Sequence, residues 1–136
     1  MSRWLFKTEP GEYSWDDLVR ERRAVWDGVT NPLALIHLRA TAKGEEVLIY
    51  HTGGERRAVG IARIAKGPHP DPSLEDPKLV VVEIAPVRPL SSAVTLETIK
   101  ADAAFAGWDL LRLGRLSIVP VPRPMWDRIL RLSATR

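Results

Sequence analysis

Two residues with the chemistry to hold a nucleobase, Trp26 and Asn31, lie five positions apart. Trp26 stands in Val25–Val29 beside Asp27 and Gly28, a turn-like segment with no amphipathic face to bury. An indole platform with fixed polar groups can bind a flipped or unpaired base by stacking and by hydrogen bonds to its edge. Asn31 offers a donor and an acceptor for that edge. Both residues also fit structural roles, Trp26 in the core and Asn31 as a helix N-cap, and the pattern leaves these alternatives open.

The other polar residues do not indicate catalysis or metal binding. His37, His51 and His69 are spread over a predicted helix, a strand end and a proline-rich loop, without the spacing of a metal site. Asp16 and Asp17 are neighbours in a predicted first helical turn and point in different directions, which disfavours a carboxylate pair. The sequence has no cysteine and no glycine-rich phosphate loop. We therefore expect no catalytic residue, no metal and no cofactor.

Positive charge is concentrated near the end of the chain. The formal net charge is +3, and from residue 112 onward one acid, Asp127, accompanies six arginines. An acidic partner would be steered toward such a surface, although a solvated basic face explains the same pattern. The six are Arg112, Arg115, Arg123, Arg128, Arg131 and Arg136.

Short elements must position Trp26 and Asn31. We expect a first strand over Arg3–Thr8, with Trp4 and Phe6 facing the core. A helix capped by Ser14 is expected to run to about Arg22. Asn31 is expected to cap a second helix, which begins at Pro32 and ends near Ala40. Trp15, Trp108 and Trp126 are expected to be mainly core residues.

The rest of the chain alternates strands with short helices. Residues 46–51 and 58–65 are predicted to form a hairpin, followed by an exposed loop over 67–77. Residues 78–85 are the candidate for the central strand, which Pro86 and Pro89 should end. The remaining predicted elements are a helix from its cap Thr95 to about residue 101, a helical piece over 105–111, a strand over 117–121 and a helix over 124–132. The pattern indicates one α+β domain over residues 1–136 containing a small, partly closed barrel. No stretch is apolar enough for a membrane span or a signal peptide, so a cytoplasmic protein is expected.

Several motifs occur in an order that resembles the EVE domain family. They are WLFKTEP at 4–10, YSWDDL at 13–18, WDGV at 26–29 followed by Asn31, residues 47–51 and 60–62, and the run from Arg112 to Pro120 with its RLS at 115–117. The resemblance covers nearly the whole chain. It implies a PUA-like fold, a partly open barrel of five or six strands flanked by short helices and related to YTH domains.

The resemblance also implies a function. Family members are regarded as readers of modified bases, notably modified cytosines in DNA, so we expect a noncatalytic protein whose partner is nucleic acid with a modified base. Such a partner would place it at the nucleoid of a prokaryote. The implied pocket has Trp26 as its stacking wall with Asp27, Gly28 and Val29, and Lys7, Thr8, Ser14 and Asn31 as polar contacts. The implied opposite wall is Tyr50 and His51, and the implied backbone contacts are Arg112 and Arg115. The rim departs from the family pattern, because apolar residues follow Asn31 at Pro32, Leu33, Leu35 and Ile36.

Two other functions stay open. Some PUA-like relatives of the ASCH type are thought to hydrolyse modified nucleosides with lysine, threonine and glutamate, and Lys7, Thr8 and Glu9 are of those types. Adjacent strand residues alternate faces, however, so Lys7 and Thr8 cannot both enter one site without distortion of the strand. A module that binds a small metabolite or a protein is the second alternative.

Overall fold

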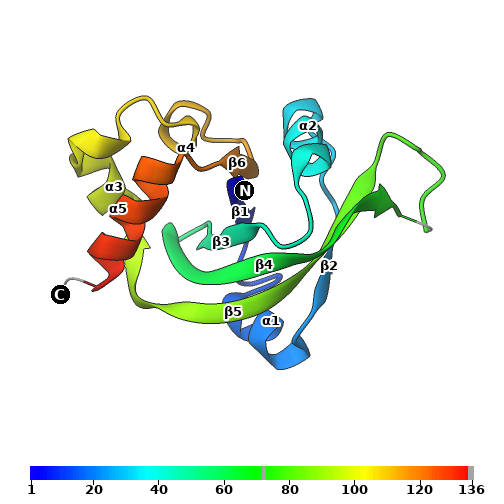
Figure 1. Cartoon of the computed structure of the whole chain (residues 1–136), viewed down its shortest axis with the longest axis horizontal. Helices are drawn as coiled ribbons and strands as arrows, with labels where there is room; N and C mark the ends of the chain where they lie inside the picture. The colour runs from blue at the N-terminus through cyan, green and yellow to red at the C-terminus, as the bar shows by residue number, and fades with distance from the viewer. Residues whose placement is uncertain (72, 135–136) are drawn as a thin grey trace.

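A curled six-stranded sheet forms the centre of the computed structural model, which describes residues 1–71 and 73–134 (Figure 1). The strands lie in the order β2-β5-β4-β3-β1-β6. β1 and β3 are parallel, and the other neighbouring pairs are antiparallel. The strands are β1 (Arg3–Thr8), β2 (Ala24–Trp26), β3 (Glu46–His51), β4 (Arg57–Pro70), β5 (Val80–Thr95) and β6 (Ile118–Pro120). The sheet is thus a half-barrel with β2 and β6 at its edges.

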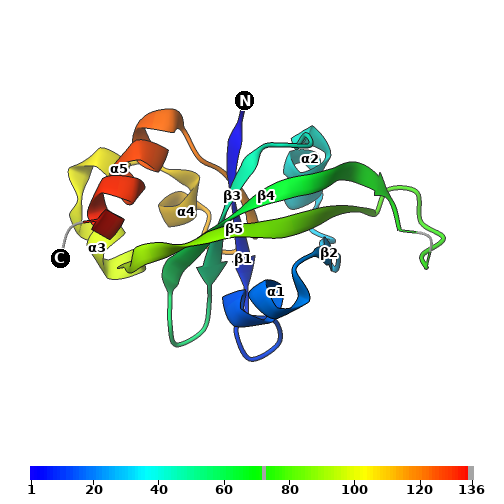
Figure 2. The same cartoon turned by 60° about the horizontal axis from the view of Figure 1, so that its bottom comes forward.

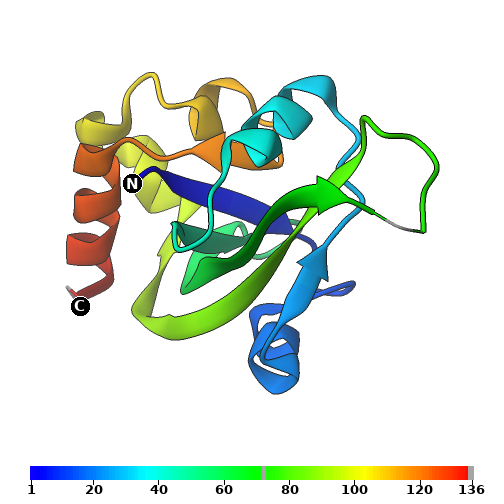
Figure 3. The same ribbon diagram turned by 45° about the vertical axis from the view of Figure 1, so that its right-hand side comes forward.

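Short helices flank the half-barrel. Figures 1 and 3 show α3 and α5 together at one end of the sheet, α2 on one side of it and α1 on the other. The helices are α1 (Trp15–Glu21), α2 (Pro32–Ala40), α3 (Leu96–Ala101), the 3-10 turn η1 (Ala103–Phe105), α4 (Asp109–Arg112) and α5 (Arg123–Ala134). The predicted α+β class and partly open barrel with short flanking helices are confirmed. The helical piece expected over 105–111 is divided into η1 and α4, because Gly107 between them has a φ of +79°.

The predicted helix caps are confirmed. Ser14 accepts a hydrogen bond from the amide of Asp17, and Thr95 accepts one from Thr98. Asn31 accepts one from Ala34 at 3.0 Å. These bonds satisfy amides that have no partner within the helix, so the chain enters α1, α2 and α3 at defined residues.

β4 and β5 form a long hairpin (Figure 2), and three predictions about this part of the chain are wrong. β5 continues through Pro86 and Pro89. On its outer side β5 pairs with β2 over residues 82–84, and beyond them that side is an edge of the sheet. At an edge the strand needs no backbone amide as a donor, so proline is tolerated there. Register shifts between β4 and β5 absorb the resulting irregularity. β5 is also second from the sheet edge and is not its central strand. Finally, residues 67–70 belong to β4, which shortens the predicted loop.

The core lies inside the curl of the sheet. Trp4, Phe6 and Trp126 are at most 5% exposed, and Trp15 and Trp108 are also buried, as predicted. Gly60 of β4 makes room for Trp15, since a Cβ at this glycine would lie 2.6 Å from three atoms of the indole. None of the described helices has the length and apolar character required to cross a membrane.

Candidate functional site

A cleft of about 400 Å³ opens where β1 ends, beside β2 and the loop that follows it. This volume lies in the range of sites that bind small ligands, about 300–1,000 Å³. Its walls come from three separate segments of the chain. The lining residues are Lys7, Thr8, Glu9, Glu12, Tyr13, Val25, Trp26, Asp27, Gly28, Val29 and Ser117.

Trp26 is at once a core residue and a wall of this cleft. The segment expected to be turn-like contains the short strand β2, and the pairing of Trp26 with Val82 of β5 fixes the indole. Its side chain is 9% exposed and packs against Phe6, with ring centroids 5.6 Å apart. Tyr13 approaches it edge-on, with centroids 6.2 Å apart and planes at 81°. The core interpretation of Trp26 is confirmed, and its role as a stacking platform stays a prediction that its place in the cleft wall allows.

Carboxylates outnumber cations around the cleft. Of the described residues that line it, three are acids, Glu9, Glu12 and Asp27, and one is a cation, Lys7. Glu9 accepts a hydrogen bond from the amide of Gly11 at 3.0 Å. Glu12 and Asp27 are exposed and have no side-chain partner in the described part of the chain. The cleft consequently offers free hydrogen-bond acceptors and disfavours a phosphate group.

Lys7 is anchored between the cleft and a neighbouring loop. Its Nζ donates to the carbonyl of Gly114 at 2.9 Å, and its amide donates to the carbonyl of Ser117 at 2.9 Å. Burial lowers the pKa of the Lys7 ammonium. These bonds fasten residues 114–117 beside the end of β1.

Lys7 and Thr8 meet at one cleft through a departure from regular strand geometry, as the alternation of strand residues requires. Both line the cleft, because β1 ends at Thr8 and the chain turns there out of the regular alternation of a strand. The Thr8 hydroxyl donates to the carbonyl of Tyr13 at 2.7 Å. The amide of Thr52 donates to the carbonyl of Thr8 at 2.9 Å. Thr8 therefore shapes the turn while it lines the cleft.

Several cleft residues were not among the predicted site residues: Tyr13, Glu9, Glu12, Val25 and Ser117. Burial, followed by the nearby Glu21 carboxylate, raises the pKa of Tyr13 to about 12, so the phenol is neutral at physiological pH. Glu9, Tyr13 and Ser117 stand inside the motifs quoted above, which was a usable signal. Glu12 and Val25 carried no such signal.

Ser14 and Asn31 do not line the cleft. Ser14 forms a capping box in which its amide donates to Asp17 Oδ2 at 2.9 Å and its hydroxyl accepts from the Asp17 amide at 3.1 Å. Asn31 uses its side-chain oxygen as the cap of α2. The exposed side chain of Asn31 follows the cleft segment 25–29 directly.

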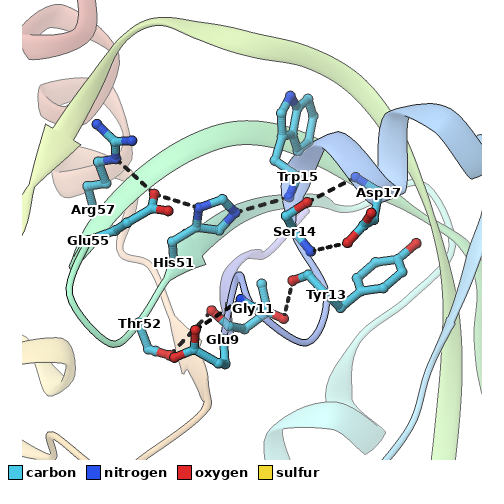
Figure 4. A network of polar contacts seen from close by, with 11 residues as sticks. Glu9, Gly11, Tyr13, Ser14, Trp15, Asp17, His51, Thr52, Glu55 and Arg57 are labelled. Atoms are coloured by element: carbon cyan, nitrogen blue, oxygen red, sulfur yellow. Dashed lines mark hydrogen bonds and ion pairs between the residues drawn. The ribbon is translucent and has the colours of Figure 1, made fainter.

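The buried His51 takes part in a polar network with the exposed side chains of Glu55 and Arg57 (Figure 4). Its Nε2 accepts a hydrogen bond from the amide of Trp15 at 3.0 Å, and its Nδ1 lies 2.9 Å from Glu55 Oε1. Arg57 donates to the same Glu55 oxygen at 3.1 Å. The hydrogen bond from His51 lowers the pKa of Glu55. This network joins β3 to the start of α1, and His51 does not line the cleft; neither does its neighbour Tyr50.

The predicted basic surface is partly neutralised. Arg112 bonds Asp109 at 2.7 Å, whereas Arg115 is exposed in the loop between Gly114 and Ser117, beside the cleft. Arg136 lies outside the described residues. Two further ion pairs are Arg123 with Asp127 at 3.9 Å and Arg128 with Asp102 at 2.8 Å. Among the described residues, no three histidine, aspartate or glutamate side chains gather so as to hold a metal ion.

Comparison with known families gives one match over almost the entire chain. The model of the EVE domain matches residues 2–132. Mouse thymocyte nuclear protein 1 is 31% identical over 166 aligned positions, which cover 97% of this chain and 74% of the mouse protein.

Solved structures agree in fold. A protein of Rhodopseudomonas palustris, solved by NMR, is 34% identical with a TM-score of 0.94, over 98% of this chain and 94% of that one. Human thymocyte nuclear protein 1, crystallised in complex with DNA containing 5-methylcytosine, is 28% identical with a TM-score of 0.93, over 100% of this chain and 99% of that one. An ASCH protein of Zymomonas mobilis is 12% identical with a TM-score of 0.60, over 97% of this chain and 99% of that one, a likeness of fold alone.

Proposed function

The chain belongs to the EVE domain family, and from this premise we propose that it binds nucleic acid containing a modified base, without catalysis, by holding that base in the cleft beside Trp26. The observation that carries the proposal is the composition of the cleft, an indole wall with unpaired carboxylates at its rim. The human relative crystallised with DNA containing 5-methylcytosine supports the choice of ligand.

The rim carboxylates favour a base with an exocyclic amino group. Cytosine presents its N4 amino group as a donor, which aspartate and glutamate accept. Asp27 and Glu12 are the acceptors without another partner in the described part of the chain. Thymine and uracil offer a carbonyl at the same position, which a carboxylate would repel. We therefore place a modified cytosine first among the candidate bases.

Apolar side chains complement the methyl group of such a base. Val29 is 8% exposed and Val25 is 53% exposed, and both line the cleft together with Trp26. Burial of one methyl group in such surroundings contributes about 0.8 kcal/mol, or roughly a fourfold gain in affinity.

The polar groups of the cleft are engaged in ways that suit binding better than hydrolysis. The Thr8 hydroxyl donates to a backbone carbonyl, Glu9 accepts from a backbone amide, and the Lys7 ammonium donates to Gly114. A nucleophile would need its hydroxyl directed at the substrate with a base in hydrogen-bond contact. Turnover of a methylated or acetylated nucleoside that Lys7→Ala abolishes would establish the hydrolase instead.

One titration series tests the proposal. Matched oligonucleotides, DNA and RNA, carry cytosine, 5-methylcytosine, 5-hydroxymethylcytosine or N6-methyladenine at one position. We expect the methylated cytosine to bind about fourfold more tightly than cytosine. Equal affinities across the series would refute base reading. Absence of binding even at low salt, where phosphate contacts are strongest, would favour a metabolite or protein ligand.

A further inference from the structure

A second hollow, of about 230 Å³, adjoins the cleft at Lys7. Lys7 lines both cavities. Tyr50, which pairs with Lys7 in the register of β3 and β1, lines the hollow but not the cleft. The other walls come from the β3–β4 loop, α3 and α4. The lining residues are Lys7, Tyr50, Thr52, Gly53, Arg56, Leu96, Lys100, Leu110, Leu111 and Gly114.

The charge of the hollow is opposite to that of the cleft. Lys7, Arg56 and Lys100 line it, and no carboxylate is among its described lining residues. Arg56 and Lys100 are exposed and make no ion pair with any residue in the ranges 1–71 and 73–134. Arg56 and Lys100 also line a neighbouring cavity together with Glu55 and Glu97. At the hollow itself the three cations face no lining carboxylate among the described residues, which favours an anion there.

The hydroxyl of Tyr50 points to the same ligand. Tyr50 is 3% exposed, and within the described ranges its hydroxyl has no hydrogen-bond partner. Burial raises the pKa of this phenol while the charge of Arg56 opposes the rise, so the hydroxyl keeps its proton at physiological pH and Arg56 lies within electrostatic reach. A protonated donor without a partner that lines a cationic hollow is suited to an oxyanion.

The backbone holds Arg56 at the rim. Its φ of +45° is one of two positive values among the described non-glycine residues, and its carbonyl accepts a hydrogen bond from the amide of Leu96 at 2.8 Å. A side chain in this conformation persists where the surrounding structure enforces it, and such positions cluster at ligand sites. This bond holds the β3–β4 loop against Leu96, the first residue of α3. Lys100 lies four positions later on the same helix.

Size and position favour a phosphate among the possible anions. A space of about 230 Å³ is smaller than the usual range of ligand sites, about 300–1,000 Å³, and suits a tetrahedral oxyanion better than a base. The acidic cleft disfavours phosphate, so a nucleotide whose base enters the cleft must place its phosphates elsewhere. We propose that the hollow formed by Lys7, Tyr50, Arg56 and Lys100 binds a backbone phosphate next to the base held in the cleft. This inference rests on the proposed function.

The test removes the two cations that do not line the cleft. Arg56→Asn combined with Lys100→Gln lowers the charge by two, and asparagine tolerates the left-handed backbone at residue 56. The matched control is Arg22→Asn combined with Lys43→Gln, because Arg22 is the other such residue, with a φ of +66°, and neither control residue lines the cleft or the hollow. Affinity for an oligonucleotide containing 5-methylcytosine is measured from about 50 to 300 mM salt.

We expect the hollow variant to bind roughly tenfold more weakly, with a salt slope reduced by about 1, while the control keeps the wild-type slope. The ratio of affinities for methylated and plain cytosine should not change, because the cleft is intact. Tyr50→Phe should weaken binding several-fold and keep the slope, since it removes no charge.

Equal slopes in the hollow variant, the control and the wild type would overturn the phosphate site and leave base reading standing. Conversely, a wild type that does not distinguish the two bases, with the slope still reduced in the hollow variant, would overturn base reading and retain the phosphate site. Inorganic phosphate supplies an independent probe. It should shift the NMR amide signals of Gly53 and Gly114 in the wild type and not in the hollow variant; shifts elsewhere only would count against the site.

Discussion

The ring of Tyr13 meets the ring of Trp26 edge to face, with centroids 6.2 Å apart and planes at 81°. Phe6 packs against the same indole at 5.6 Å. Residues from the β1–α1 turn and from β1 thus hold the one tryptophan that both belongs to the core and lines the cleft. These contacts fix the orientation of Trp26, and under the proposed function this would reduce the entropic cost of binding a base.

Tyr13 should matter for binding through its ring. Tyr13→Ala removes the edge-to-face contact, worth about 0.5–1.5 kcal/mol, and should weaken oligonucleotide binding about two- to tenfold as Trp26 loses its support. Tyr13→Phe keeps the ring and should bind within about twofold of the wild type. Comparable losses in both variants would instead assign the effect to the hydroxyl. Fluorescence anisotropy with a labelled oligonucleotide measures all three proteins.

The hydroxyl of Tyr13 should affect how the free energy of unfolding depends on pH in alkaline solution. Its pKa of about 12 in the folded chain exceeds the unfolded value of 10.0. The unfolded chain therefore loses this proton first, and the free energy of unfolding falls as pH rises from 10 toward 12. Tyr13→Phe lacks this contribution, so its free energy of unfolding should decline less over that window. Urea titrations at pH 9, 10 and 11 compare the two proteins, and parallel declines would contradict the shifted pKa.

Gly60 should tolerate no side chain. Its Cβ would lie 2.6 Å from the ring of Trp15, so Gly60→Ala should destabilise the protein by about 1–3 kcal/mol. Gly54→Ala is the matched control, because nothing lies within 4 Å of its Cβ position, and it should change stability by less than about 0.5 kcal/mol. Chemical denaturation measures both, and an unaffected Gly60→Ala would show that Trp15 can move aside.

His51 should act on stability and not on base reading. His51→Phe keeps an aromatic ring but removes the nitrogen that accepts a hydrogen bond from the Trp15 amide. A buried amide without a partner should destabilise the protein by about 1–3 kcal/mol. His37→Phe is the control, since its Nε2 has no hydrogen-bond partner among the described residues. The ratio of affinities for methylated and plain cytosine should stay at the wild-type value. A changed ratio would show that His51 contributes to recognition of the base.

Local signals predicted most of the fold. The caps Ser14, Asn31 and Thr95 were recognisable because a side-chain oxygen before an apolar run satisfies free amides. The path of β5 through Pro86 and Pro89 could not be predicted in this way. A strand tolerates proline where one of its sides is unpaired, and this side of β5 becomes unpaired where the short β2 ends.

The cleft shows the same division between local and long-range information. Lys7, Thr8 and residues 26–29 were predicted to contribute to one pocket, and all of them line it. Tyr50 and His51 were predicted as its far wall, yet the register of β3 beside β1 places Tyr50 in the second hollow and His51 under α1. A pairing register depends on contacts far apart in sequence, so motif order alone could not assign those faces.

The central claim is that the bound base stacks on Trp26, and the affinity of Trp26→Ala for oligonucleotides tests it most directly. The substitution also removes core packing, so its folded state is verified by thermal unfolding, and Trp26→Leu replaces it if it does not fold. Loss of base stacking should cost about 1–3 kcal/mol, which weakens binding roughly five- to 150-fold for methylated and plain cytosine alike. Wild-type affinity in a folded variant without Trp26 would contradict the account.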